Sequence, residues 1–181
     1  EIVYSVLGGG IDTTTTLLSC ALAWLSEHPQ ARTALIENPK LMPTATEEFL
    51  RYFTPIQGLA RTVAKEHTVR GCKFAPSDRL FISWAAANHD PEKFDRPDDV
   101  VLDRRPNQHQ AFRLGAHRCL GMNFARVEFQ IMLSELLRRL PDYKVDSSRV
   151  VRYPNIGNAN GYISIPATFT PGPRVGSAEV L

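Results

Sequence analysis

Cysteine is scarce in this sequence, and its spacing excludes several classes of protein. The 181 residues contain only three cysteines, Cys20, Cys72 and Cys119, which are odd in number and far apart. A disulfide framework is therefore not expected, and a reducing compartment is favoured. No CxxC pair occurs, so the sequence also excludes a zinc ribbon, a thioredoxin-like redox pair and covalent attachment of a c-type haem.

An excess of charge is lacking as well. The formal net charge is +2, and the Lys and Arg residues are scattered rather than gathered in runs, so we expect no nucleic-acid partner. The longest uninterrupted apolar run is too short to span a membrane. With 43% hydrophobic and 22% charged residues, the composition is that of an ordinary globular protein with enough apolar residues for a sizeable core.

The sequence also has no initiating Met, no signal peptide and no polar leading segment, and it starts directly in the apolar stretch EIVYSVL. This start predicts that residues 1–181 are a piece of a longer protein. A membrane anchor in a preceding part stays open. Because no internal repeat and no linker divides the sequence, we expect these residues to lie within one domain.

Helical patterns dominate the first third of the chain. Residues 4–27 fit either one long helix or a strand, a glycine turn and a helix, with Pro29 marking the end. Thr44 and Glu47 fit a capping box at the start of another helix. Runs of β-type residues separated by turn signals predict short antiparallel strands. The expected helices are 30–38 and 44–53, and the expected strands are 62–69, 71–74 and 79–83.

The second half begins with residues 90–110, which are rich in Pro, Asp, Asn and Arg and predict a long irregular segment. In residues 120–140 the apolar side chains recur on more than one face, which predicts a buried helix. These side chains are Phe124, Val127, Ile131, Leu133, Leu136, Leu137 and Leu140. Residues 162–169 alternate like a strand pair. The expected fold class is mainly α with a smaller β portion.

The stretch FRLGAHRCLGMNFARVE, residues 112–128, places Cys119 in a basic, glycine-punctuated loop at the expected first turn of the last helix. Unpaired N–H groups and the helix dipole there favour the thiolate that a nucleophile or a metal ligand requires. The cations Arg113, His117 and Arg118 act in the same direction. Residue chemistry alone leaves other interpretations open: a buried structural cysteine, a nucleophile with His117 as its base, or a zinc site with His117 as second ligand.

Five residues of this stretch match the FxxGxHxCxG loop of the cytochrome P-450 family, the haem-thiolate monooxygenases: Phe112, Gly115, His117, Cys119 and Gly121. The sequence therefore resembles that family. The resemblance implies that Cys119 is the axial ligand of the iron of haem b and that the other four residues lie against the haem. It also implies that Arg61 and His117 pair with the haem propionates. Arg113 departs from the pattern, because the family usually has glycine there, and this bears on how closely the loop packs on the porphyrin.

Two further motifs appear in the family's order. Glu48 and Arg51 have the family's ExxR spacing, and Arg104 in RRPNQH matches the arginine of its meander segment. An i, i+3 pair alone is a weak signal, since such pairs contribute only ~0.2–0.5 kcal/mol on helix surfaces. By resemblance the three residues form a buried ion network that fixes the meander behind the cysteine loop. The AANHDPEKFDRPDDV stretch lies at a family-like interval. The resemblance implies that residues 1–181 are the C-terminal part of a single cytochrome P-450 domain.

The remaining motif is GGGIDTTTT. Taken alone it suggests a phosphate-binding turn with Asp12 as N-cap, but no GK[ST] follows and a third glycine for GxGxxG is missing. Gly9, Gly10, Asp12, Thr13 and Thr14 instead match the [AG]Gx[DE]T[TS] motif of the family's helix across the haem face. The resemblance implies that the glycines leave room for dioxygen and that Asp12 and Thr13 deliver protons to it.

By resemblance, the whole protein would activate dioxygen with two electrons from a ferredoxin-type partner and hydroxylate a lipophilic small molecule. An acidic ferredoxin would dock on a basic patch of Arg113, Arg118 and Arg126. Minor contributors to the substrate pocket would be Gln57, Gly58, Leu59, Asn158 and Ala159.

The closing stretch GNANGYISIPATFTP resembles soluble bacterial members of the family and favours a cytoplasmic location. Two rivals stay open. One is a haem sensor or carrier without turnover, which would need no proton relay at Asp12 and Thr13. The other is an inactive truncated fragment, and the isolated piece is expected to be inactive.

Overall fold

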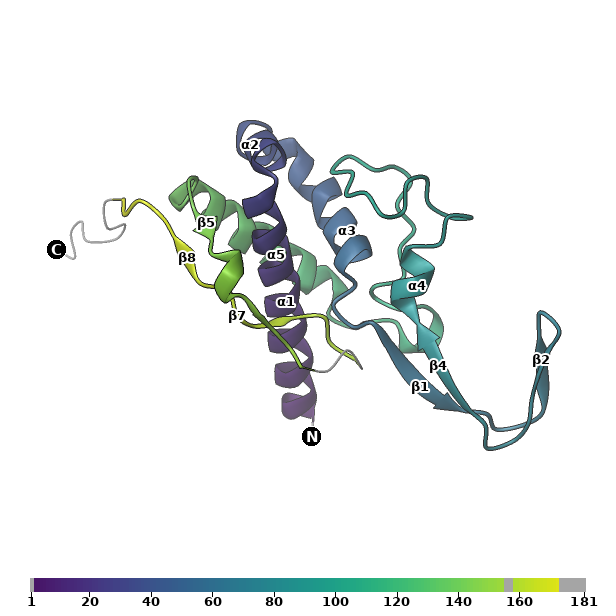
Figure 1. The fold of residues 1–181 in the computed structure, drawn as a ribbon. Helices are drawn as coiled ribbons and strands as arrows, with labels where there is room; N and C mark the ends of the chain where they lie inside the picture. Colours follow the sequence, from purple (N-terminus) through teal and green to yellow (C-terminus); the bar gives the residue numbers. More distant parts are fainter. Residues whose placement is uncertain (1, 155–157, 173–181) are drawn as a thin grey trace.

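The computed structural model describes residues 2–154 and 158–172, so Gly157 of the closing stretch lies outside the described residues. The core is formed by three helices that pack together (Figure 1): α1, Ile2–Glu27, α3, Met42–Phe53, and α5, Met122–Arg139. Leu25, Phe49 and Phe129 meet in this core and are each 0% exposed. The expectation of a mainly α fold with a smaller β portion is confirmed.

The glycine-rich start of the chain belongs to α1, which is continuous from Ile2 to Glu27. The alternative of a strand followed by a phosphate-binding turn is therefore wrong. The hydroxyls of Thr13 and Thr15 donate to the carbonyls of Gly9 and Ile11, both at 2.7 Å, which satisfies them within the helix. From Thr14 onward α1 is largely buried, whereas the preceding turns are exposed.

Within α1, residues Val6–Glu27 are long and apolar enough to cross a membrane by length and composition, and 33% of the most apolar window is buried. The uninterrupted-run criterion missed this segment because threonines and glycines interrupt its apolar residues. A buried core helix passes the same test, and the C-terminal half of α1 contributes to the core.

Between α1 and α3 the chain forms α2, Pro29–Glu37, and the 3-10 turn η1, Pro39–Leu41. Both begin with proline, whose missing N–H is harmless in a first turn. The predicted capping box is wrong. Helix α3 begins at Met42, before Thr44, and the Thr44 hydroxyl donates to Leu41 O at 3.0 Å. Glu47 does not reach back to the helix start, because it binds side chains from distant segments instead.

The expected short antiparallel strands are present. They are β1, Gly58–Thr62, paired with β4, Arg79–Ser83, and β2, His67–Val69, paired with β3, Cys72–Phe74. These hairpins extend away from the helices (Figure 1). The first strand begins earlier than expected, and residues 63–66 lie outside it. Helix α4, Trp84–Asn88, follows β4 directly, and residues 90–110 form turns and bends, as expected.

The C-terminal strands pair differently from the prediction. The remaining elements are η2, Gly115–His117, β5, Lys144–Val145, η3, Ser147–Arg149, β6, Val151–Arg152, β7, Tyr162–Ser164, and β8, Ala167–Thr168. Residues 162–169 do contain two strands, but β7 pairs with β6 and β8 pairs with β5. The expected strand pair is wrong, because each strand finds its partner in an earlier segment.

Helix α5 is buried along one face only. Phe129, Leu133 and Leu137, spaced four residues apart, face the core and are at most 2% exposed. Phe124 and Ile131 belong to another face and are 72% and 59% exposed. The predicted helix is present, but in this chain the prediction that it is buried holds for one face only.

Candidate functional site

Cys119 lies in a tight turn immediately before α5. Its backbone N–H donates to Phe112 O at 2.9 Å, and the Arg118 N–H donates to Gly115 O at 3.1 Å. Gly115 has a φ of 67°, in the left-handed region that glycine adopts without steric cost. The thiol is exposed. It precedes the N-cap residue Gly121, so the expectation that Cys119 is in the first helical turn is wrong by a few residues.

The donor atoms near Cys119 suit one kind of metal centre better than another. Among the residues that the structure describes, no group of three or more His, Cys, Asp or Glu side chains is placed to hold a metal ion. A chelated zinc ion therefore does not fit. A single exposed thiol fits a prosthetic group such as haem, because the porphyrin supplies four ligands itself and the protein needs to add only an axial one.

The other two thiols have different surroundings. Cys20 is buried in α1 with its Sγ 3.2 Å from Asn160 O, and burial raises the pKa of this thiol to about 12. Cys72 is exposed on β3. Neither lies in a glycine-containing turn at a helix entrance, so only Cys119 combines exposure with that setting.

Apolar surface surrounds the candidate site. Leu114 and Leu120, on either side of the turn, are 63% and 98% exposed. On α1, a Cβ atom added at Gly9 or Gly10 would meet nothing within 4 Å. Such exposed apolar surface usually marks a binding site or an interface. At Leu114 and Leu120 this surface suits a flat apolar macrocycle.

Asp12 and Thr13 lie on the exposed half of α1. The Thr13 hydroxyl donates to Gly9 O at 2.7 Å. Within the described part of the chain, no hydrogen bond joins either side chain to the Cys119 turn.

Two basic side chains, Arg61 and His117, are expected to contact the cofactor. Arg61 lies on β1, where it pairs with Leu80, and its Nη1 donates to the carbonyl of neighbouring Ala60 at 2.9 Å. His117 is exposed in η2. Neither has an acidic partner within the described residues, so each can pair with a carboxylate of a bound group.

The expected pocket residues come together in part. The Gln57 N–H donates to Asn158 O at 2.8 Å, and Ile56 forms a bridge with Ala159. The Gln57 side chain, however, donates to Thr54 O at 2.6 Å and thereby closes the C-terminus of α3. This contact gives Gln57 a structural role in addition to any role in a pocket.

The other two expected pocket residues belong to the β1–β4 hairpin. Gly58 is buried, and a Cβ there would lie 2.5 Å from the Phe81 ring, so the close packing requires glycine. Leu59 pairs with Ile82 and is half-buried. A hollow of about 290 Å³ lies elsewhere, between α1 and β7, and none of the expected site residues lines it.

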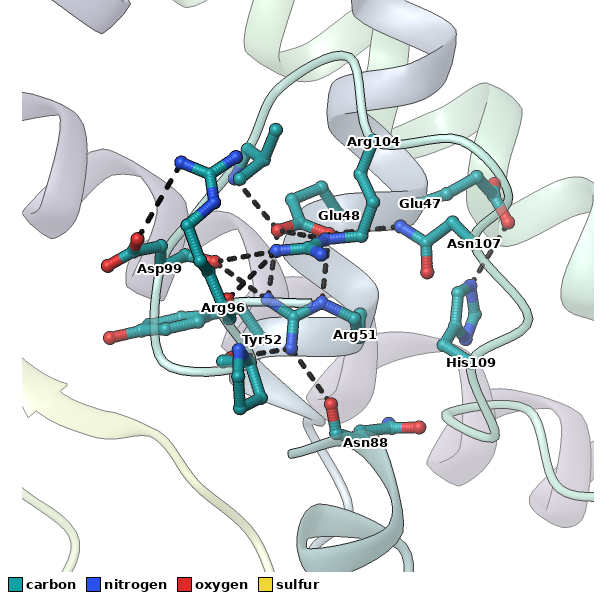
Figure 2. Close-up of polar contacts among 12 residues, drawn as sticks. Glu47, Glu48, Arg51, Tyr52, Asn88, Arg96, Asp99, Arg104, Asn107 and His109 are labelled. Atoms are coloured by element: carbon teal, nitrogen blue, oxygen red, sulfur yellow. Dashed lines mark hydrogen bonds and ion pairs between the residues drawn. The ribbon is translucent and has the colours of Figure 1, made fainter. Parts of the chain in front are cut away.

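Glu48, Arg51 and Arg104 form the polar centre of the molecule (Figure 2). Arg51 donates from Nε and Nη2 to the two oxygens of Glu48, both at 2.9 Å, and both side chains are 0% exposed. Arg104 donates from Nε to the same carboxylate at 3.0 Å. Burial alone would raise the pKa of Glu48, but the hydrogen bonds from Arg51, Val101 and Arg104 lower it.

The rest of the Arg51 guanidinium holds the irregular segment. Its Nη1 donates to Asn88 O at 2.8 Å and to Pro97 O at 2.7 Å, and its Nη2 donates to Asp99 O at 2.8 Å. A helix, a short helix and the 90–110 segment are therefore joined at one buried residue. Since every N–H donor of the Arg51 guanidinium has an acceptor, Arg51 and Glu48 can remain charged in the interior.

A second cluster beside it was missed from the sequence. Glu47 accepts from Arg126 Nε and Nη2 at 2.6 and 2.8 Å, and it contacts His109 Nε2 at 3.0 Å. Because His109 Nδ1 accepts from the Ala111 N–H, its Nε2 carries the proton donated to Glu47. Burial raises the pKa of Glu47, but the Arg126 and His109 hydrogen bonds dominate and lower it to about 2. In the sequence, the signal for this cluster was the pair of adjacent acids Glu47 and Glu48 on one helix.

The three arginines of the expected electron-donor patch have different surroundings. Arg126 is bound to Glu47, and its Cζ lies 4.6 Å from the centroid of the Phe112 ring. Arg113 lies over Trp84 at 4.8 Å. Of the three arginines only Arg118 is exposed, because the other two are engaged in internal contacts. The basic patch of Arg113, Arg118 and Arg126 as a docking surface stays a prediction.

Comparisons with known proteins agree on one family. A sequence profile of the cytochrome P-450 family matches residues 1–156. A steroid C26-monooxygenase of Mycolicibacterium smegmatis is 34% identical over 178 residues, which cover 97% of this chain and 44% of that protein. A biotin biosynthesis cytochrome P-450 of Bacillus subtilis is 36% identical over 160 residues, which cover 88% of this chain and 40% of that protein.

Solved structures are similar in the same way. The cytochrome P-450 PksS of the Bacillus subtilis bacillaene polyketide synthase has a TM-score of 0.88 at 31% identity, over 93% of this chain and 44% of that one. CYP109E1 from Bacillus megaterium, in complex with corticosterone, has a TM-score of 0.84 at 34% identity, over 88% and 43%. The chain thus spans less than half the length of the relatives it matches. Because the profile covers most of its residues, this chain belongs to the cytochrome P-450 family.

Proposed function

We propose that residues 1–181 form the C-terminal part of a single haem-thiolate monooxygenase domain, with Cys119 as the axial ligand of haem b. The observation that carries the proposal is the exposed Cys119 thiol in a tight turn before α5, where the described residues place no group of three or more donors that could chelate a metal ion. The match to the family over residues 1–156 supports it. The whole protein would then hydroxylate a lipophilic substrate.

Each residue around the thiol has a part in this proposal. Gly115 and Gly121 allow the backbone to approach the porphyrin, and Phe112 lies at the start of the loop. Arg61 and His117 pair with the propionates, since both lack an acidic partner within the described chain. When bound, the haem supplies activation of dioxygen and transfer of one oxygen atom, with two electrons and two protons reducing the other atom to water.

Asp12 and Thr13 would serve proton delivery. The Asp12 side chain is exposed. The Thr13 hydroxyl donates to Gly9 O. It could instead rotate to donate to a bound molecule beside the helix, where Gly9 and Gly10 leave space. A carrier or sensor of haem would have no use for this pair, which favours an enzyme.

The substrate and partners follow from the family more coarsely. Relatives include a steroid C26-monooxygenase, and one similar structure contains corticosterone. A lipophilic organic molecule is therefore the proposed substrate class, with Gln57, Gly58, Leu59, Asn158 and Ala159 as minor contacts. A ferredoxin-type protein would supply electrons in the cytoplasm, and the exposed Arg118 is the cation left for its docking.

The deciding experiment uses the reduced, CO-bound absorption spectrum of the haem-loaded full chain. Cys119→His should abolish the red-shifted band of thiolate ligation, because imidazole gives globin-like or peroxidase-like ligation instead. Cys72→Ser is the matched control, since Cys72 is also exposed, and it should leave the band intact. A thiolate-type spectrum that survives Cys119→His would overturn the proposal.

A further inference from the structure

The residue after Phe112 has an unfavourable backbone conformation. Arg113 stands where the family usually has glycine, and its φ is 63°, in the left-handed region. Glycine adopts this region freely, whereas a side chain brings Cβ too close to the following carbonyl. Strain of this kind persists only where surrounding contacts hold it. The question is which contact holds Arg113.

The contact is the indole ring of Trp84. The Cζ of Arg113 lies 4.8 Å from the ring centroid, within the range of a cation–π interaction. Trp84 is only 5% exposed, so the stacked face is shielded from water, and such interactions strengthen on desolvation. A planar guanidinium can lie flat on the ring, which a lysine ammonium cannot do.

This stack joins two segments of the proposed haem site. Trp84 is the first residue of α4 and directly follows β4, the partner of the strand that carries Arg61. On the other side, Arg113 opens the turn that Cys119 closes through its hydrogen bond to Phe112 O at 2.9 Å. The stack thus links the Cys119 turn to the β1–β4 pair that carries Arg61.

The backbone leading into the turn is held by the same short helix. The Gln110 N–H donates to Asn88 Oδ1 at 2.7 Å, and the Arg113 N–H donates to Gln110 O at 2.8 Å. Asn88 is 0% exposed. Helix α4 thus contacts the loop at two points. The buried Asn88 side chain holds the backbone at Gln110, and the Trp84 indole holds the Arg113 side chain.

We propose that Arg113 is a positioning residue: its stack on Trp84 locks the Cys119 turn in its left-handed conformation and sets its place against the β1–β4 hairpin. The Arg113 side chain restrains the backbone at this position, whereas glycine would leave it free to change conformation. The expected effect on haem retention rests on the proposed ligation by Cys119. The Arg113–Trp84 contact itself does not require bound haem. Arg113 is accordingly a residue of the interior contact and not of the donor-docking surface.

The first test is hydrogen exchange in the full chain without haem. Arg113→Gly removes both the strain and the stack. If the stack is a lock, amides of residues 114–119 should exchange roughly tenfold faster, as expected for loss of a shielded cation–π contact. Unchanged or slower exchange would mean that Arg113 only strains the turn, and it would overturn the proposal.

Arg70→Gly provides a matched control. Arg70 also has a positive φ, 46°, but it is exposed in the β2–β3 turn and lies over no ring among the described aromatic contacts. This variant relieves backbone strain without removing a stack, so exchange at residues 114–119 should not change. A similar acceleration in Arg70→Gly would attribute the effect to general destabilisation and would count against the lock.

Two further variants test the partner and the geometry. Arg113→Lys keeps the charge without the flat contact and should accelerate exchange nearly as much as Arg113→Gly. Trp84→Leu should accelerate it too, and adding Arg113→Gly to Trp84→Leu should have little further effect, because the two residues share one interaction. Additive effects would contradict the proposal. If Trp84→Leu fails to fold, the two Arg113 variants still decide.

The last test concerns haem. In the haem-loaded protein, transfer of haem to an excess of a haem-free acceptor protein should be roughly tenfold faster for Arg113→Gly than for wild type or Arg70→Gly. Equal transfer rates would limit the lock to the empty protein and overturn its proposed role at the cofactor. If the wild-type chain binds no haem, the proposed function fails, whereas the exchange experiment still judges the lock.

Discussion

The buried network around Arg51 and the exposed surroundings of Cys119 lie in the same chain but differ in how complete they are. Arg51 and Glu48 are 0% exposed and use their hydrogen-bonding groups within the described residues. Cys119, Leu120 and the first turns of α1 face outward. The described residues thus complete the buried network among themselves, whereas the surface around Cys119 is open. Under the proposed function, haem and the rest of the domain would cover that surface.

The largest expected effect is on the scaffold. Arg51→Ala should destabilise the chain by about 3–5 kcal/mol, because it leaves the buried Glu48 carboxylate without its main partner. Urea unfolding at neutral pH measures this. Arg138→Ala, which removes a partner of the exposed Glu135, should leave the unfolding free energy nearly unchanged, because solvent screens an exposed ion pair. Similar losses in both variants would erase the distinction between the two regions.

The two faces of α5 provide the next comparison. Leu133 is 0% exposed, so Leu133→Ala should cost about 2–5 kcal/mol. Ile131 is 59% exposed, and Ile131→Ala should stay within about 0.5 kcal/mol in this chain. Denaturation midpoints of the two variants give the answer. A large cost at Ile131 would mean that its face is covered in solution.

Glu47 gives a pH-dependent effect of intermediate size. Its pKa in the fold is about 2, below the ordinary 4.5, so its ionised form stabilises the fold above pH 4.5 and this contribution is lost as the pH falls towards 2. Discounted for partial exposure, the contribution is about 2 kcal/mol. Glu47→Gln should therefore lose about that much stability at pH 7 and progressively less in acid. Glu66→Gln, at an exposed position, should show no such trend.

Thr13 should have the smallest effect on stability. Its hydroxyl only bonds the preceding turn of α1, so Thr13→Ala should change the unfolding free energy by no more than about 0.5 kcal/mol. In the active holoenzyme it should lower the product formed per electron consumed and divert oxygen to peroxide, since proton delivery would fail. Wild-type coupling would show that Thr13 is only a helix residue.

The features that local sequence determines were predicted well. The last helix follows from apolar periodicity, and the short strands follow from turn chemistry, which act over a few neighbouring residues. The long first helix was one of the two alternatives that the glycine run left open. The Cys119 loop and the ExxR pair came from the resemblance to the family, and the role of Cys119 as a ligand stays a prediction. Glycine at 115 is predictable for the same reason, because its left-handed φ is a local requirement.

Other features were decided only by tertiary contacts. Glu47 fits a helix cap by spacing, yet it binds Arg126 and His109, which lie 79 and 62 residues away in the sequence. The sequence predicts Arg113 as a surface cation, but in the structure its guanidinium lies over the Trp84 ring. The physical reason is common to both cases: a charged side chain takes the partner that shields it best, and that partner is set by how the elements pack and not by its neighbours in the sequence.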